Sequence, residues 1–230
     1  MFYKTKWINV ITVLDNIYDS IIWVKINQHN GNKCTAIAFC YIPPENSVFY
    51  DFCDVDLYDC LEESVAHFKD SFNVYVAGDL NSRTGIRDDF IYNDNLDKSV
   101  LNAISPICNY DEGSECCKRS SMDMLVNTFG RKLISLCKTT GLRIVNGRHS
   151  QDPNGNITFY NSRGTSLIDY VLADYCLFEK ILEFSAGVFN TFSDHSPVAF
   201  CLQCITPSSS PGFDNNITQQ GELFVRLLNG

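Results

Sequence analysis

Three short segments that lie far apart in the chain constrain its fold most. Gly78–Asn81, Ser166–Tyr170 and Ser193–His195 each follow or sit in an apolar run typical of a β-strand. Each segment would therefore place polar side chains at a strand end. We expect the fold to bring these distant strand ends together, so that their polar side chains converge in one cleft.

The polar residues of these segments suit the hydrolysis of a phosphodiester, which requires an activated water and neutralisation of charge on the phosphoryl oxygens. Asn81 is uncharged and can donate a hydrogen bond to a phosphate oxygen. His195 can also donate, and Asp169 is its expected partner because an unpaired carboxylate in an apolar strand would be costly. Two alternatives remain open: Asp-x-Asn after glycine also forms ordinary turns, and Asp169 could cap a local turn.

Together the segments resemble the endonuclease/exonuclease/phosphatase family, the group of deoxyribonuclease I and the abasic-site endonucleases. The motif residues are most similar to those of the endonuclease domains of non-LTR retrotransposons. Those domains are expected to contain GD-[FL]-N-[SA]-R, S-x-I-D-Y-[VI]-L and SDH-x-P-V. Here the three patterns stand as Gly78–Arg83, Ser166–Leu172 and Ser193–Val198.

Two further segments fit the same family, Tyr41–Pro44 and Asn146–Arg148, so the resemblance runs from Trp7 to Gln203. The Tyr41 hydroxyl could contact phosphate, although a core tyrosine at a strand end is a serious alternative. Arg83 and Asn146 are the expected substrate-binding residues. A solvated loop charge is an equal alternative for Arg83.

The resemblance implies an α/β fold: a four-layer sandwich of two mixed β-sheets with helices outside and the site in a cleft at one rim. It implies that Asp79 orients or deprotonates the attacking water and that Asp194 contacts a metal. The expected ion is Mg²⁺, or Mn²⁺ in its place, because both prefer oxygen ligands. DNA is the expected substrate. The full catalytic set is Asp79, Asn81, Asp169, His195 and Tyr41.

The same resemblance predicts a domain that lacks its first strands. In the family, two strands ahead of the matching region carry an Asn that positions the phosphate and a Glu that binds the metal. No residue of Met1–Ile26 stands in the matching context. Weak metal binding and weak or absent activity are therefore expected. The alternatives are a non-catalytic remnant or binding module and, less favoured, a lipid or inositol phosphoesterase.

Composition predicts a folded domain: 45% of the 230 residues are hydrophobic and only 20% are charged. The net charge of −9 counts against tight nonspecific DNA binding, although acidity also serves solvation. No apolar stretch approaches the ~20 residues of a membrane span. The 11 scattered cysteines suit a reducing compartment, so an intracellular location, nucleus or cytoplasm, is expected. The sequence gives no indication of membrane association or of an obligate protein partner.

Periodicity predicts helices from Val55 to Phe68, capped by Asp54, and from Met122 to Thr140, capped by Ser120 or Ser121 and ended by Gly141. The polar stretch 85–119 is predicted to be a surface excursion. One domain is predicted over residues 1–205, followed by a linker and tail at 206–230. Strands are expected at Ile8–Leu14, Ile21–Ile26, Thr35–Tyr41, Val74–Ala77, Leu142–Val145, Ile157–Tyr160, Leu167–Leu172, Ile181–Val188 and Val198–Leu202.

Overall fold

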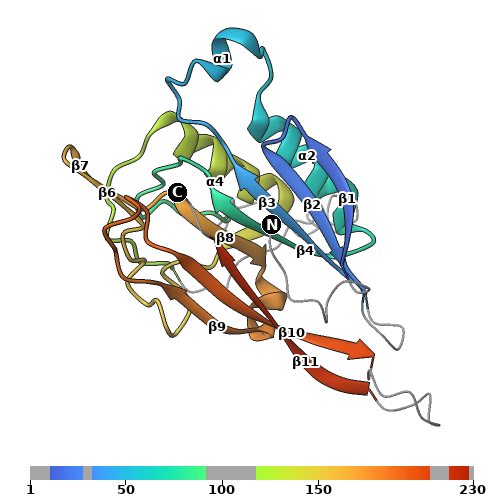
Figure 1. The fold of residues 1–230 in the computed structure, drawn as a ribbon. Coiled ribbons are helices and arrows are strands. Elements are labelled where there is room, and N and C mark those ends of the chain that lie inside the picture. Colours follow the sequence, from blue (N-terminus) through green and yellow to red (C-terminus); the bar gives the residue numbers. More distant parts are fainter. Residues whose placement is uncertain (1–10, 28–32, 92–117, 208–217, 228–230) are drawn as a thin grey trace, which may run out of the picture.

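The computed structural model describes residues 11–27, 33–91, 118–207 and 218–227, which form two packed sheets with helices on one side (Figure 1). The larger sheet has the strand order β1-β2-β3-β4-β8-β5. β3 and β4 run parallel and the other neighbours antiparallel, so this sheet is mixed. Its strands are β1 (Ile11–Ile17), β2 (Ile21–Ile26), β3 (Thr35–Tyr41), β4 (Asn73–Asp79), β8 (Asp169–Asp174) and β5 (Leu142–Ile144).

The smaller sheet has the order β11-β10-β9 and packs against the larger one. Its strands are β9 (Ile181–Ala186), β10 (Val198–Pro207) and β11 (Thr218–Leu227). Phe184 and Phe200, both fully buried, belong to the apolar layer between the sheets, together with Ile37 and Val171 of the larger sheet. The predicted α/β sandwich of two sheets is confirmed. The smaller sheet differs from the prediction, because its described strands pair only antiparallel.

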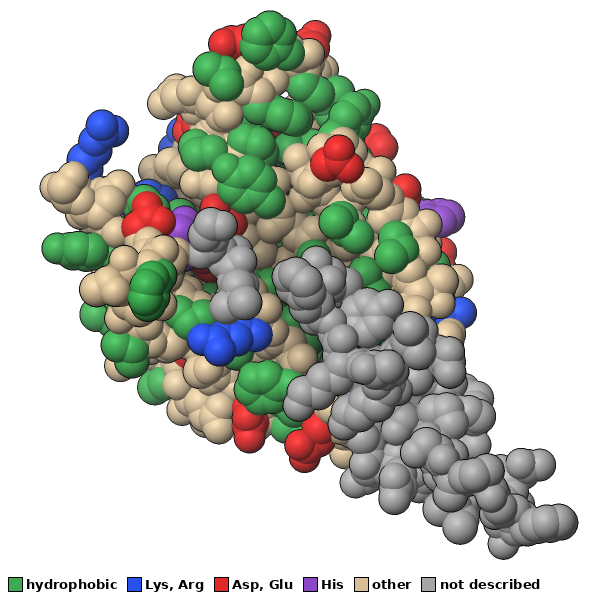
Figure 2. Space-filling view, viewed as in Figure 1, with side chains coloured by type: hydrophobic (Ala, Val, Ile, Leu, Met, Phe, Trp, Pro, Cys, Tyr) green, Lys and Arg blue, Asp and Glu red, His purple; other side chains and the backbone are tan. Residues whose placement is uncertain are grey.

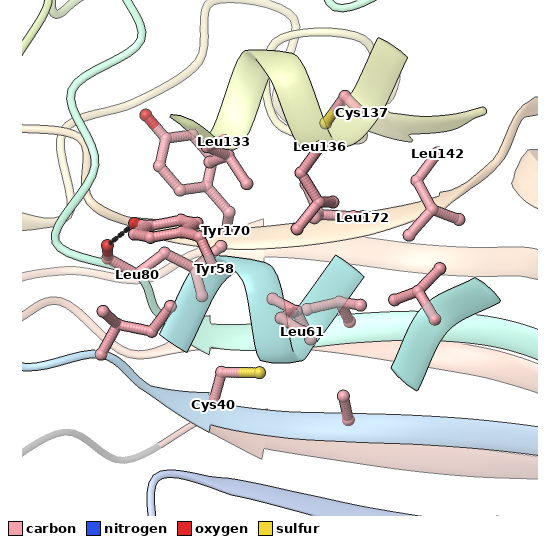
Figure 3. Packing of buried hydrophobic residues seen from close by; sticks show 14 of the residues in the cluster. Cys40, Tyr58, Leu61, Leu80, Leu133, Leu136, Cys137, Leu142, Tyr170 and Leu172 are labelled. Carbon is pink, nitrogen blue, oxygen red and sulfur yellow. Dashed lines mark hydrogen bonds between the residues drawn. The ribbon is translucent and has the colours of Figure 1, made fainter. Parts of the chain in front are cut away.

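Helices α2 (Leu57–Lys69) and α4 (Thr128–Thr140) cover the other face of the larger sheet. Leucines of both helices, Leu61 and Leu133 among them, lie against the sheet (Figure 3). The Tyr58 hydroxyl donates to the carbonyl oxygen of Leu80, which ties α2 to the chain just after β4 (Figure 3). The layers within the described residues are thus helices, larger sheet and smaller sheet.

The remaining elements are short. They are helix α1 (Phe49–Phe52), the hairpin strands β6 (Phe159–Asn161) and β7 (Gly164–Ser166), and the 3-10 helix η2 (Tyr175–Lys180). The predicted strand at Ile8–Leu14 is seen as β1 from Ile11 onward, and residues 8–10 lie outside the described ranges. None of the described helices has the length and apolar character needed to cross a membrane.

Both predicted helix starts require correction. α2 is capped by Asp56, not Asp54, because the Asp56 carboxylate accepts from the Tyr58 backbone N–H at 2.9 Å. α4 begins at Thr128, six residues later than predicted, with Asn127 as its cap. The preceding residues are irregular, and Asp123 among them binds Arg83 instead of joining the helix. Gly141 ends α4 as predicted, with a left-handed φ of 76°.

The prediction of a linker and tail at 206–230 is wrong for residues 218–227. This segment forms β11, which pairs with β10 from Val198–Leu227 to Pro207–Thr218. Leu223, Val225 and Leu227 are buried and alternate with exposed residues, so one face of the strand covers the core. Residues 208–217 lie outside the described part of the chain.

The predicted surface excursion at 85–119 also differs at its described ends, and residues 92–117 lie outside the described ranges. Asp89 and Phe90 are buried, as is Arg119. The Asp89 carboxylate accepts from both terminal guanidinium nitrogens of Arg148, each at 2.7 Å, and from the Ile144 backbone N–H. An acidic residue can be buried here because its charge is paired.

Candidate active-site cleft

A cleft of about 670 Å³ opens where the carboxyl ends of β3 and β4 meet the β6–β7 hairpin. The residues come from six separate parts of the chain, so only the folded sheet assembles them. The cleft is lined by Tyr41, Pro44, Glu45, Asp79, Asn81, Arg83, Asn127, Phe159, Ser166, Ile168, Asp194 and His195. Six of the predicted site residues are in this group: Tyr41, Asp79, Asn81, Arg83, Asp194 and His195.

The turn after β4 fixes Asp79. Gly78 has a φ of 154°, and a Cβ there would lie 1.9 Å from the Cys40 carbonyl oxygen, so the neighbouring strand requires glycine. Asp79 follows at the strand end and is only 4% exposed. Asn81 has a left-handed φ of 46°, and its backbone N–H donates to Asp79 Oδ1 at 2.9 Å. The turn therefore holds a nearly buried carboxylate at the cleft wall.

The Asn81 side chain does not have the free amide protons that donation to a phosphate oxygen would require. Its Nδ2 donates to Asp79 Oδ2 at 3.1 Å and to the Ile42 carbonyl oxygen at 2.9 Å. Both amide protons are engaged within the protein, so they are not presented to a phosphate oxygen. In this conformation Asn81 positions Asp79.

His195 lies between the two aspartates. Its Nδ1 is 3.0 Å from Asp169 Oδ2, and its Nε2 is 4.0 Å from Asp79 Oδ2. Asp169 is fully buried and pairs directly with Asp79 across β4 and β8. The Phe159 ring packs edge-on against the imidazole, with ring centroids 4.9 Å apart. With Nδ1 held by Asp169, the imidazole presents Nε2 toward Asp79.

The pKa of the Asp79 carboxyl is raised to about 7. Burial is the largest cause, followed by the charge of Asp169, and the hydrogen bonds from Asn81 and the charge of His195 oppose them only in part. Burial lowers the pKa of His195, but the hydrogen bond and charge of Asp169, with the charges of Asp79 and Asp194, outweigh it and leave this pKa raised.

Asp79, Asp169 and His195 also form a group that could hold a metal ion, because one ligand atom from each lies within 4.8 Å of the others. Asp194, the predicted metal ligand, lines the cleft but is not a member of this group. Two buried carboxylates beside one imidazole leave excess negative charge, which a hard cation would neutralise. The donor set thus fits a divalent cation at the cleft wall.

Arg83 and Tyr41 both face the cleft. Arg83 is held by Asp123, to which its Nε and one terminal nitrogen donate at 2.8 and 2.7 Å, and it also donates to the Thr165 carbonyl oxygen. Tyr41 pairs with Asp79 across β3 and β4 and is 55% exposed. Its exposure rules out the alternative of a core tyrosine, and the bidentate pair shows that Arg83 is more than a solvated loop charge.

The prediction that Asn146 binds substrate is wrong. Asn146 is fully buried behind the site, where its Nδ2 donates to the Asp169 carbonyl oxygen at 3.1 Å. Its Oδ1 accepts from the Val171 backbone N–H at 3.0 Å. The side chain satisfies backbone groups of β8 just beyond the end of β5, so it supports the strand that carries Asp169 instead of facing the cleft.

Sequence reasoning missed two cleft residues, Asn127 and Glu45. The Asn127 Oδ1 accepts from the backbone N–H groups of Arg83 at 2.8 Å and Gly130 at 2.6 Å, and its Nδ2 donates to the Asn81 carbonyl oxygen at 3.0 Å. It therefore joins the start of α4 to the loop after β4. An asparagine just before the helical spacing was an available cap signal. Glu45 had no such signal.

Comparisons with known proteins give matches only among solved structures. No protein-family model matches the chain, and no curated protein does. The endonuclease domain of TRAS1, a telomere-specific non-LTR retrotransposon, is 13% identical with a TM-score of 0.45, over 81% of this chain and 64% of that one. The 3'-5' exonuclease NExo from Neisseria meningitidis is 15% identical with a TM-score of 0.47, over 82% and 68%.

A third match is the AP endonuclease LMAP from Leishmania major, 13% identical with a TM-score of 0.48, over 78% of this chain and 53% of that one. The chain thus spans less than two thirds of the TRAS1 and LMAP chains. The three structures described are an endonuclease domain of a retrotransposon, an exonuclease and an AP endonuclease. At these TM-scores the chemistry of the cleft has to be argued from its own residues.

Proposed function

We propose that this chain is a metal-dependent phosphodiester hydrolase of the retrotransposon-endonuclease type that acts on DNA. The observation that carries the proposal is the placement of His195 between Asp169, at 3.0 Å, and Asp79, at 4.0 Å, inside one cleft. An aspartate-held imidazole beside a carboxylate of raised pKa provides a proton donor and a proton acceptor within one phosphate's reach.

Each cleft residue has a role in this reaction. Asp79 accepts the proton of the attacking water, which suits a carboxylate with a pKa of about 7. His195, charged and held by Asp169, donates from Nε2 to a phosphoryl oxygen. Arg83 is oriented by Asp123 at the same cleft and counters phosphate charge. The Tyr41 hydroxyl is available to hydrogen-bond the substrate backbone.

The proposed cation is Mg²⁺ or Mn²⁺, which the carboxylates of Asp79 and Asp169 would hold, with Asp194 contacting it from the same cleft. When bound, it would neutralise charge on the phosphoryl oxygens and leaving group. Glu45, Asp79 and Asp194 line the cleft opposite Arg83 and His195, so a cation would offset the acidic side chains beside a bound phosphate. Because Mg²⁺ retains several waters and few protein carboxylates reach it here, we expect weak metal binding and slow turnover.

The second candidate is a non-catalytic binding module. The observation that favours it is the Asn81 amide, whose protons are both engaged within the protein. Such a module would bind nucleic acid without cleaving it. The two candidates therefore differ in product formation.

Plasmid nicking separates the two candidates. We expect slow nicking at millimolar Mn²⁺ or Mg²⁺, none with EDTA, and losses of at least about 100-fold in Asp79→Ala and His195→Ala. His67→Ala is the matched control, because this histidine is exposed on α2 and does not line the cleft. Nicking that survives both cleft substitutions would overturn the proposed roles. Binding without nicking at any metal concentration would favour the binding module.

A further inference from the structure

Exposed aromatic side chains lie on the two segments that also carry the cleft residues Phe159 and Asp194. Tyr160 on β6 is 59% exposed, Phe189 is 37% exposed and Phe192 is 95% exposed. The Tyr160 and Phe189 rings lie against each other, with centroids 6.1 Å apart. We call Tyr160, Phe189 and Phe192 the aromatic rim. Neighbouring rings that are exposed together are typical of a surface that binds another molecule.

The aromatic rim adjoins the segments that carry the cleft residues. The Tyr160 backbone N–H donates to the Asp194 carbonyl oxygen at 2.8 Å. The neighbouring residue, Phe159, lines the cleft and packs on His195. Phe192 stands two residues before Asp194, in a loop closed by a bridge between Asn190 and Ser193. A strand with its phosphate at His195 would therefore pass its adjacent nucleotides along these rings.

Charge around the cleft argues against recognition through phosphates alone. Arg83 is the one Lys or Arg side chain among the described cleft-lining residues, and Asp123 already pairs with it. Lys and Arg side chains are sparse among the coloured residues of the face in Figure 2, where hydrophobic side chains are frequent. Duplex binding relies on several phosphate contacts, whereas stacking of bases on aromatic rings does not.

We propose that the aromatic rim binds unpaired bases, so that the preferred substrate class is single-stranded nucleic acid or an unpaired stretch within a duplex. The inference rests on the proposed function of the cleft, because that function puts the strand's phosphate beside His195. Bases inside a duplex are stacked on one another and cannot offer their faces to Tyr160 or Phe192. In a single strand each base has a free face, which gives binding with little dependence on sequence.

Fluorescence anisotropy with a labelled 12-nucleotide DNA, single-stranded or annealed to its complement, tests the inference in EDTA. Cleavage cannot occur there, so the readout does not depend on activity. We expect the single strand to bind at least about 10-fold more tightly than the duplex. Tyr160→Ala and Phe192→Ala should each weaken single-strand binding by about 5- to 100-fold, whereas Tyr160→Phe keeps the ring and should retain it.

Phe224→Ala is the matched control, because Phe224 is 61% exposed on β11 and lies outside the cleft. Equal binding of duplex and single strand, or no loss in the Tyr160 and Phe192 variants, would overturn the inference. A concentration-dependent dimer that Phe192→Ala disrupts would instead make the rim a self-association surface and also overturn it. Retained single-strand binding without metal-dependent nicking would contradict the proposed function but not the inference about the aromatic rim.

Discussion

Two buried carboxylates, Asp89 beside the larger sheet and Asp79 at the end of β4, have opposite surroundings. Asp89, fully buried near the β5 edge, receives two hydrogen bonds from Arg148 and one from a backbone N–H. Asp79, 4% exposed at the end of β4, faces the carboxylate of Asp169 and receives hydrogen bonds only from its own turn. The first charge is compensated by the fold, and the second is compensated only in part. An incompletely compensated carboxylate in a cleft is what a functional site requires.

The largest expected effect comes from breaking the compensated pair. Arg148→Met should destabilise the protein by about 3–5 kcal/mol, because it leaves Asp89 buried without its cation. Urea unfolding at pH 7 measures the change. Asp89→Asn in the same background should restore part of the loss, since the buried charge is removed. A loss under about 1 kcal/mol in Arg148→Met would show that Asp89 is not held by this pair.

The incompletely compensated carboxylate, Asp79, should make the free energy of unfolding depend on pH. The pKa of Asp79 is raised by folding, so the folded state binds its proton more tightly than the unfolded chain. Its contribution is therefore fully present below the unfolded pKa, near 4, and is lost as pH rises through about 7. We expect the wild type to lose on the order of 2–4 kcal/mol relative to Asp79→Asn between pH 4 and 8. Parallel pH profiles of the two proteins would contradict this.

A smaller effect is expected at Asn127, which joins α4 to the loop that carries Asp79 and Asn81. Asn127→Ala removes the helix cap and should cost about 1–2 kcal/mol in urea unfolding. Asn127→Asp retains an acceptor for the Gly130 and Arg83 N–H groups and loses only the donor to Asn81, so it should cost less. An equal loss in both variants would mean that the contact with Asn81, not the cap, dominates.

The smallest effect is stabilisation by the metal. Ten millimolar Mg²⁺ or Mn²⁺ at pH 8 should stabilise the wild type by about 1 kcal/mol if the dissociation constant is near millimolar. A double substitution, Asp79→Asn with Asp194→Asn, should abolish the effect. Thermal melting of metal-free samples and of samples with Mg²⁺ or Mn²⁺ measures it. A shift that persists in the double variant would place the ion elsewhere.

The sequence predicted the aspartates and the histidine of the cleft, but not all of the groups that they contact. Asp79, Asp169 and His195 carried a signal because their motifs occur together in the order of one family, whereas Asp-x-Asn after glycine alone would have indicated an ordinary turn. Asn146 was wrongly assigned because its motif gives no information on which way a side chain turns. Burial behind β8 decides that, and only the tertiary fold sets it.

Asp89 and β11 illustrate a second limit. Asp89 lies in a polar stretch that reads as solvated, and its burial depends on Arg148, 59 positions later in the chain. β11 follows a Ser- and Pro-rich stretch typical of a linker. Its alternation of buried and exposed residues is explained only by its pairing with β10. Long-range pairing overrides local composition in both cases.

The most direct test of an uncompensated, metal-binding carboxylate at the cleft is the titration of the Asp79 side chain itself. Carbon-13 NMR of aspartate carboxyls, with Asp79 assigned from its absence in Asp79→Asn, follows the group from pH 3 to 9. We predict a midpoint near 7 without metal, which falls when Mg²⁺ is added. A midpoint near 4 that Mg²⁺ does not move would contradict the proposed site.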